Sequence, residues 1–263
     1  MRILSYILLI LTIGAISLQS QGFDWQYSSR LPFRYPYLFA GLNGGVDYEM
    51  HDAALDLSEN NFGCCQFNQG SGFGTVIGLK SEFWLKGLWA VNMQISYLTR
   101  RANFTADGYQ VPFTVFDRQG KIIGHDTATF ENEMQSSLSY ITLELGGKRR
   151  LFGSHLFAGA SIELGYLVTQ KYTQIERVLG PSYFKYNDGS QERNLGDYTF
   201  GNIQNFIFTP KLLIGYDIPL GLGLYTTPYF SVGFPLQNVA ETGKWNIWSF
   251  NFGISILRSI AYQ

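Results

Sequence analysis

Two histidines stand directly before aspartates, as His51-Asp52 and His125-Asp126, and both pairs lie in or near predicted loops. A histidine base oriented by a carboxylate can activate a nucleophile, so these pairs raise the hypothesis of a surface hydrolase. Neighbouring residues in a strand, however, point to opposite faces. No serine lies in a nucleophile-elbow context and no glycines have phosphate-loop spacing, so we expect no catalytic residue and no cofactor.

Cys64 and Cys65 are the two cysteines of the chain, and they are adjacent. In an oxidising compartment such a pair can form a vicinal disulfide or a bridge to another chain, and the remaining alternative is two free thiols. We predict the vicinal disulfide. Two neighbouring thiols supply too few ligands for a zinc site, so we expect no metal.

Six charged residues alternate with apolar residues inside otherwise hydrophobic segments: Lys80, Glu82, Arg100, Glu144, Glu163 and Lys211. Ionisable groups at membrane depth can mark an ion or proton path. They can also form a structural network, because a buried charge is costly unless an opposite charge compensates it. We predict the structural network.

The composition indicates which elements must hold these residues. Charged residues make up 15% and aromatic residues 16% of the chain, whereas soluble domains carry about 25% charged residues. After the first 20 residues, the sequence has no apolar run of the ~20 residues that a spanning helix needs. In lipid every backbone N–H and C=O must be paired internally, so a closed β-barrel is the fold that remains.

Period-two alternation of apolar and polar residues, the pattern of membrane-crossing strands, recurs along the chain. It predicts an all-β, eight-stranded antiparallel up-and-down transmembrane β-barrel with strands at 38–49, 72–84, 89–100, 137–146, 155–170, 205–217, 224–236 and 247–257. The seventh segment is the weakest, because Pro228 and Pro235 interrupt it and its two faces look alike.

The connections between these segments differ in length. Short joins such as 148–154 are expected to be turns on the inner side of the membrane. The stretches 52–71, 101–135 and 171–203 are longer, and we expect them to be extracellular loops.

The alternation also fits a lipocalin-like barrel, which turns its apolar face inward around a ligand. The polar face favours the membrane alternative, because it is rich in glycines, such as Gly159 and Gly253, that would weaken a water-exposed strand. Inside a narrow barrel these glycines leave room for the six charged side chains. Trp89 and Trp248 lie near the ends of apolar faces, as interfacial aromatic girdles require.

The N-terminus begins with Arg2, continues with an apolar run over 3–16 and ends with small residues. This order is typical of a secretory signal peptide, so we expect a signal peptide at 1–20 and a single barrel domain at 21–263. The formal net charge is −1, so no nucleic-acid partner is expected.

The run 60–74, NNFGCCQFNQGSGFG, with the hairpin 79–88 and the strand 89–97, resembles the outer-membrane β-barrel proteins of Bacteroidetes-type bacteria. The resemblance implies a small OmpA/OmpX-like barrel in a Gram-negative outer membrane. Related barrels often precede a peptidoglycan-binding domain. This sequence ends directly after the eighth segment, so peptidoglycan tethering is not carried over.

These observations lead to three functional hypotheses. The first is a non-enzymatic outer-membrane barrel with a side-chain-filled lumen, contacting lipid and binding a protein or surface partner through its extracellular loops. The second is a narrow channel or transporter, and the third is the hydrolase with a His-Asp loop pair. We favour the first.

Overall fold

The computed structural model describes residues 36–56, 66–85, 89–117, 119–186, 188–221, 223–241 and 243–262. The predicted signal peptide at 1–20 and the Cys64-Cys65 pair lie outside these residues. No helix within the described ranges is long and apolar enough to span a membrane.

All the strands described belong to one antiparallel sheet. Eight of its ten strands form a closed ring, because β10 pairs with both β1 and β9. In ring order they are β1 (Pro36–Asp56), β2 (Gln66–Leu85), β3 (Trp89–Phe116), β4 (Ile122–Arg150), β5 (Leu156–Gly180), β7 (Phe206–Tyr216), β9 (Leu224–Gly233) and β10 (Lys244–Tyr262). The predicted eight-stranded up-and-down barrel is therefore confirmed.

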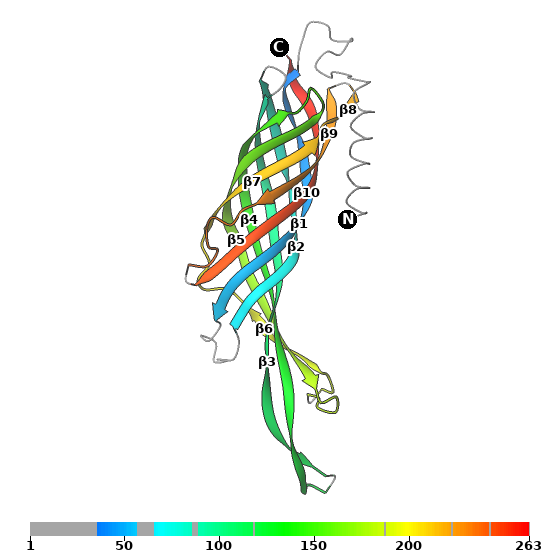
Figure 1. The fold of residues 1–263 in the computed structure, drawn as a ribbon, viewed down its shortest axis with the longest axis vertical. Helices are drawn as coiled ribbons and strands as arrows, with labels where there is room; N and C mark the ends of the chain where they lie inside the picture. The colour runs from blue at the N-terminus through cyan, green and yellow to red at the C-terminus, as the bar shows by residue number, and fades with distance from the viewer. Residues whose placement is uncertain are drawn as a thin grey trace, which may run out of the picture.

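The two remaining strands lie at opposite ends of the barrel. β6 (Glu192–Tyr198) pairs with the end of β5, and β8 (Ile218–Gly221) continues the path of β7 beside β9. In Figure 1 the start of β1 and the end of β10 lie at the same end, which we call the turn end. The opposite end, from which β3 and β4 project, is the arm end.

The prediction of a loop at 101–135 was wrong, because most of this stretch is strand. β3 runs to Phe116 and β4 begins at Ile122, so the two strands form a long hairpin, the arm, that projects beyond the barrel (Figure 1). The expected loop at 171–203 is likewise partly strand, since β5 reaches Gly180 and β6 follows. The far part of the arm, 108–116 and 122–127, has no regular alternation of buried and exposed side chains, so the pattern used to find strands is missing there.

The sequence does not show which residues of the seventh predicted strand point into the barrel, and the packing of β9 shows it. Tyr225 and Thr227 of β9 are buried inside the barrel, while Phe230 packs against Phe252 of β10 with ring centroids 4.7 Å apart. β9 ends at Gly233, before Pro235, which has no N–H to donate to a strand partner.

Two inward glycines show why the narrow interior needs residues without a side chain. A Cβ atom at Gly253 would lie 2.3 Å from the ring of Tyr229, and one at Gly215 would lie 2.5 Å from the ring of Phe157. These glycines therefore make room for large side chains that fill the lumen, as the sequence predicts.

Candidate functional site

Near the turn end, buried charges cross the barrel interior. Lys148 Nζ lies 2.8 Å from Glu82 Oε2 and 2.9 Å from Asp217 Oδ1, and all three side chains are fully buried. Arg150 reaches the second oxygen of Asp217 at 3.4 Å, and Lys80 contacts Glu82 at 3.2 Å. We call these five residues the turn-end cluster.

The turn-end cluster is also packed by aromatic and hydroxyl groups. Tyr225 donates a hydrogen bond to Glu82, and Thr227 donates one to Asp217 at 2.9 Å. Lys148 Nζ lies 4.3 Å from the centroid of the Phe157 ring, a cation–π contact. These contacts compensate charges that would otherwise be costly to bury.

A second group of charges, the central cluster, lies farther toward the arm end. Arg100 contacts Glu49 and Glu163, each at 3.3 Å. Lys211 contacts Glu144 at 3.3 Å and also pairs with Glu163. Every member is buried or nearly so, so the cluster forms a continuous ionic network inside the barrel.

Both clusters join opposite walls of the barrel. Lys148 connects Glu82 on β2 to Asp217 at the end of β7, and these strands are four steps apart in the ring of eight. Arg100 connects β1 to β5, which are also four steps apart. The side chains therefore cross the whole section of the lumen at two levels.

An aromatic layer closes the interior on the arm side of these clusters. Trp245, fully buried, donates a hydrogen bond from Nε1 to His51 Nδ1 at 2.9 Å. Phe104 and Phe200 pack against Trp245 with ring centroids 5.8 and 5.2 Å away.

All six charged residues singled out in the sequence face the interior. The structure brings Arg100, Glu144, Glu163 and Lys211 together, and places Lys80 with Glu82 in the turn-end cluster. The sequence analysis missed Lys148 and Arg150, which it assigned to a turn. They lie four and six residues after Glu144 and therefore on the same inward face of the strand. Continuing the alternation of 137–146 by four residues would have found them.

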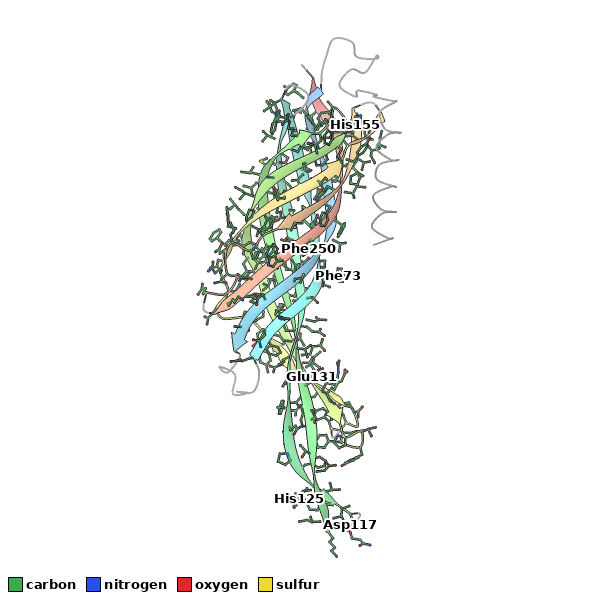
Figure 2. All side chains as sticks on the ribbon, viewed as in Figure 1. Phe73, Asp117, His125, Glu131, His155 and Phe250 are labelled. Atoms are coloured by element: carbon green, nitrogen blue, oxygen red, sulfur yellow. The ribbon has the colours of Figure 1, made fainter. Side chains whose placement is uncertain are left out.

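Neither His-Asp pair brings its two side chains together. His51 is buried inside the barrel, whereas Asp52 points outward and pairs with Lys244 at 2.5 Å. His125, near the arm tip in Figure 2, contacts Thr114 Oγ1 at 3.2 Å, while Asp126 accepts from the backbone N–H of Thr127 at 2.8 Å. No group of His, Cys, Asp and Glu within the described ranges could hold a metal ion.

The outer surface of the barrel is a belt of exposed apolar side chains. Ile77 is 68% exposed, Phe252 64% and Leu42 64%, and Figure 2 shows Phe73 and Phe250 on the same wall. On β3 the outward side chains from Trp89 to Tyr97 are apolar or aromatic, over the ~9–11 residues that a tilted strand needs to cross a bilayer.

The base of the arm has a small core and polar ties of its own. Phe130 stacks on Tyr109 at 5.4 Å and packs edge-on against Phe184 at 5.6 Å. Glu176 accepts hydrogen bonds from Tyr109 at 2.5 Å and from Tyr186 at 2.6 Å. Burial, reinforced by the Glu176 hydrogen bond, raises the pKa of Tyr186.

The far part of the arm is open along both edges within the described residues. The pairing of β2 with β3 ends at Gly70 and Phe104, and the pairing of β4 with β5 ends at Thr129 and Gly180. Apolar side chains beside the tip are exposed: Phe116 58%, Ile122 56% and Ile123 64%.

No protein-family model and no curated protein matches the chain. Among solved structures, the chain is similar to the attachment invasion locus protein Ail of Yersinia pestis at 8% identity and a TM-score of 0.32, covering 83% of this chain and 97% of that one. Neisserial surface protein A matches at 8% identity and a TM-score of 0.34, covering 84% and 97%. The outer membrane protease OmpT of Escherichia coli matches at 10% identity and a TM-score of 0.31, covering 89% and 100%.

Proposed function

We propose that the protein is an integral outer-membrane β-barrel, non-enzymatic and closed in its interior, that presents the arm to a partner outside the cell. Its origin in a Bacteroidetes-type bacterium and its OmpA-like character remain predictions from the sequence resemblance. Export through a cleaved signal peptide at 1–20 belongs to the same proposal.

The membrane location is inferred from the distribution of side chains, which is the reverse of that in a soluble protein. Apolar side chains such as Ile77 and Phe252 face outward, while charged side chains such as Lys148 and Glu82 are buried inside. A belt of this extent is far beyond the exposed apolar patches of soluble monomers. In the closed ring each wall strand has a partner strand on both sides, which is how a β-sheet meets the demand of a bilayer for internal backbone pairing.

The filled interior argues against a channel or transporter. The two charge clusters and the Trp245 layer cross the lumen in succession, and eight-stranded barrels are just wide enough for side chains to fill. We therefore expect the interior to stabilise the barrel rather than to pass a solute.

The partner-binding role is carried by one observation, the projecting arm with open edges and an apolar tip. Unpaired strand edges can accept an extended segment of another protein as an added strand, with pockets for alternate side chains. We propose that a protein partner docks on the edge of β3 beyond Phe104 and covers Phe116, Ile122 and Ile123.

The experiment is crosslinking in intact cells followed by purification of the barrel and identification of the proteins attached to it. A triple variant, Phe116→Thr, Ile122→Thr and Ile123→Thr, keeps strand-forming residues but removes the apolar tip. We expect it to lose a partner that the wild type retains. Leu220→Thr, which removes an exposed apolar residue at the turn end, is the matched control and should retain it. Retention by the triple variant would contradict the proposal.

A further inference from the structure

Three rows of outward side chains follow one another at the arm-side edge of the apolar belt. Tyr97, Ile141 and Tyr166, paired in register across β3, β4 and β5, form an apolar row, and exposed Val168 follows on β5, where a bulge inserts one residue. Thr99, Ser139 and Thr169 form the next row, and Thr99 is hydrogen bonded to Thr75 of β2 at 3.0 Å. On β3 and β4 apolar groups thus give way to hydroxyl groups over two residues, or about 7 Å along the strands, and on β5 the same change spans the bulge.

The third row carries positive charge. Arg101 pairs in register with Ser137, and Ser137 pairs with Lys171, so the two cations flank a serine on adjacent strands. Both cations are exposed. With neighbouring strands ~4.8 Å apart, the Cα atoms of Arg101 and Lys171 are separated by roughly 10 Å, a span that one phosphorylated headgroup can bridge.

These two cations differ from other outward cations at the same end of the barrel. Lys244 is paired with Asp52 at 2.5 Å, and Arg177 is surrounded by glutamates, with Glu192 at 2.8 Å. Within the described residues Arg101 and Lys171 have no acidic partner within ion-pair distance. Their charge is therefore available to a ligand.

A hollow opens beside Lys171 on the same outer face. It has a volume of about 670 Å³ and is lined by residues that include Gln135, Ser137, Lys171, Thr173, Asp197 and Thr199. Asp197 is one row farther from the belt and accepts a hydrogen bond from Thr173 at 2.6 Å. The hollow thus offers a cation next to the belt and amide, hydroxyl and carboxylate groups beyond it, a set suited to a phosphate and a sugar.

We propose that Arg101, Ser137 and Lys171, together with this hollow, bind the headgroup of a phosphorylated glycolipid of the outer leaflet. The phosphate lies between the two cations, the sugar hydroxyls contact Gln135 and Asp197, and the acyl chains lie along the belt below Tyr97 and Tyr166. The site rests on the proposed membrane location of the barrel. It would hold lipid at the base of the arm, on the strands from which the arm projects.

The test is native mass spectrometry of the full mature protein in detergent, titrated with three lipids. These are a diphosphorylated glucosamine-disaccharide lipid, the same lipid without phosphates, and phosphatidylglycerol. We expect the first to bind most tightly. The double variant Arg101→Gln/Lys171→Gln should weaken that binding ~30-fold, from the roughly fivefold that one juxtamembrane cation typically contributes. Lys244→Gln is the matched control, because its charge is already neutralised, and it should bind like the wild type.

Each other outcome overturns the proposal. Equal binding of the lipid without phosphates, or of the double variant, would show that the cations are not the site. Tighter binding of phosphatidylglycerol would show that the sugar is not recognised, and competition by millimolar inorganic phosphate would indicate a site for the free anion. Folding of the same proteins into phosphatidylcholine vesicles, read as a heat-dependent gel shift, is measured in parallel. Failure to fold there would count against the membrane location itself, whereas folding without lipid binding would count against this site alone.

Discussion

Lys148 on β4 and Glu82 on β2 form a 2.8 Å ion pair across β3, and the same ammonium group holds Asp217 on the opposite wall at 2.9 Å. All three side chains are buried. A single cation therefore ties together parts of the ring that share no backbone hydrogen bonds. This contact closes the interior, and it makes the stability of the barrel depend on the positive charge of Lys148.

Replacing Lys148 with Met should destabilise the barrel, because Glu82 and Asp217 would be left as buried charges without their shared partner. The expected loss is about 3–5 kcal/mol, the range for breaking a buried pair from one side. Urea unfolding in lipid vesicles measures it. The neighbouring variant Arg149→Met is the control, since Arg149 points outward and lies over the Trp89 ring at 5.1 Å. Equal midpoints for the two variants would contradict the role of the turn-end cluster.

An arginine placed on the outer face should cost stability according to depth in the bilayer. Ile95→Arg lies in the middle of the outward belt of β3 and should cost about 2–4 kcal/mol, whereas Asn103→Arg on the same face lies beyond the belt and should cost about 0–1 kcal/mol. The same unfolding measurement compares them. A barrel whose outer face met water would tolerate both substitutions equally.

The interior should block ion flow. Protein reconstituted into a planar bilayer should show no steady porin-sized conductance, because side chains fill the lumen at both charge clusters. Single-channel recording is the measurement. Large, stable openings from purified wild-type protein would instead support the channel hypothesis.

The base of the arm should loosen at high pH through Tyr186. Burial and the hydrogen bond to Glu176 raise the pKa of this phenol above its ordinary value of ~10. Above that pH the unfolded arm loses the proton while the folded arm keeps it, so the stabilisation is present below pH ~10 and is lost as the pH rises. A spin label at position 182 should therefore keep its mobility up to pH ~10 and gain mobility as the pH rises above that value. Tyr186→Phe should remove this dependence, and an unchanged profile in that variant would exclude Tyr186 as its cause.

The barrel could be predicted from sequence because its outward side chains are apolar and its inward side chains are small or polar. The segments 72–84 and 247–257 carry that contrast over their full length, and the strands β2 and β10 contain them. The arm could not be predicted in this way. Beyond Ala106 few side chains of β3 are buried, so the residues from Gly108 to Phe116 alternate weakly and resemble a loop.

The candidate site was predictable in part for a related reason. Residue type and parity place Lys80, Glu82, Arg100, Glu144, Glu163 and Lys211 inside the barrel, but parity alone does not say which charges meet. Partner choice depends on strand stagger, which sets Lys148 level with Glu82 and Asp217 across the lumen. His51 shows the converse. Its position beside Asp52 suggested a general base in a loop. Because β1 continues to Asp56, the His51 side chain points into the barrel, where it accepts a hydrogen bond from Trp245.

We propose an outer-membrane barrel whose arm stands outside the cell. The most direct measurement inserts a specific protease site in the arm tip between Gln119 and Gly120 and treats intact cells with that protease, followed by carbonate extraction of their membranes. We expect cleavage on intact cells, with both fragments remaining in the carbonate-resistant membrane. Cleavage that requires cell lysis, or release of the fragments by carbonate, would contradict it.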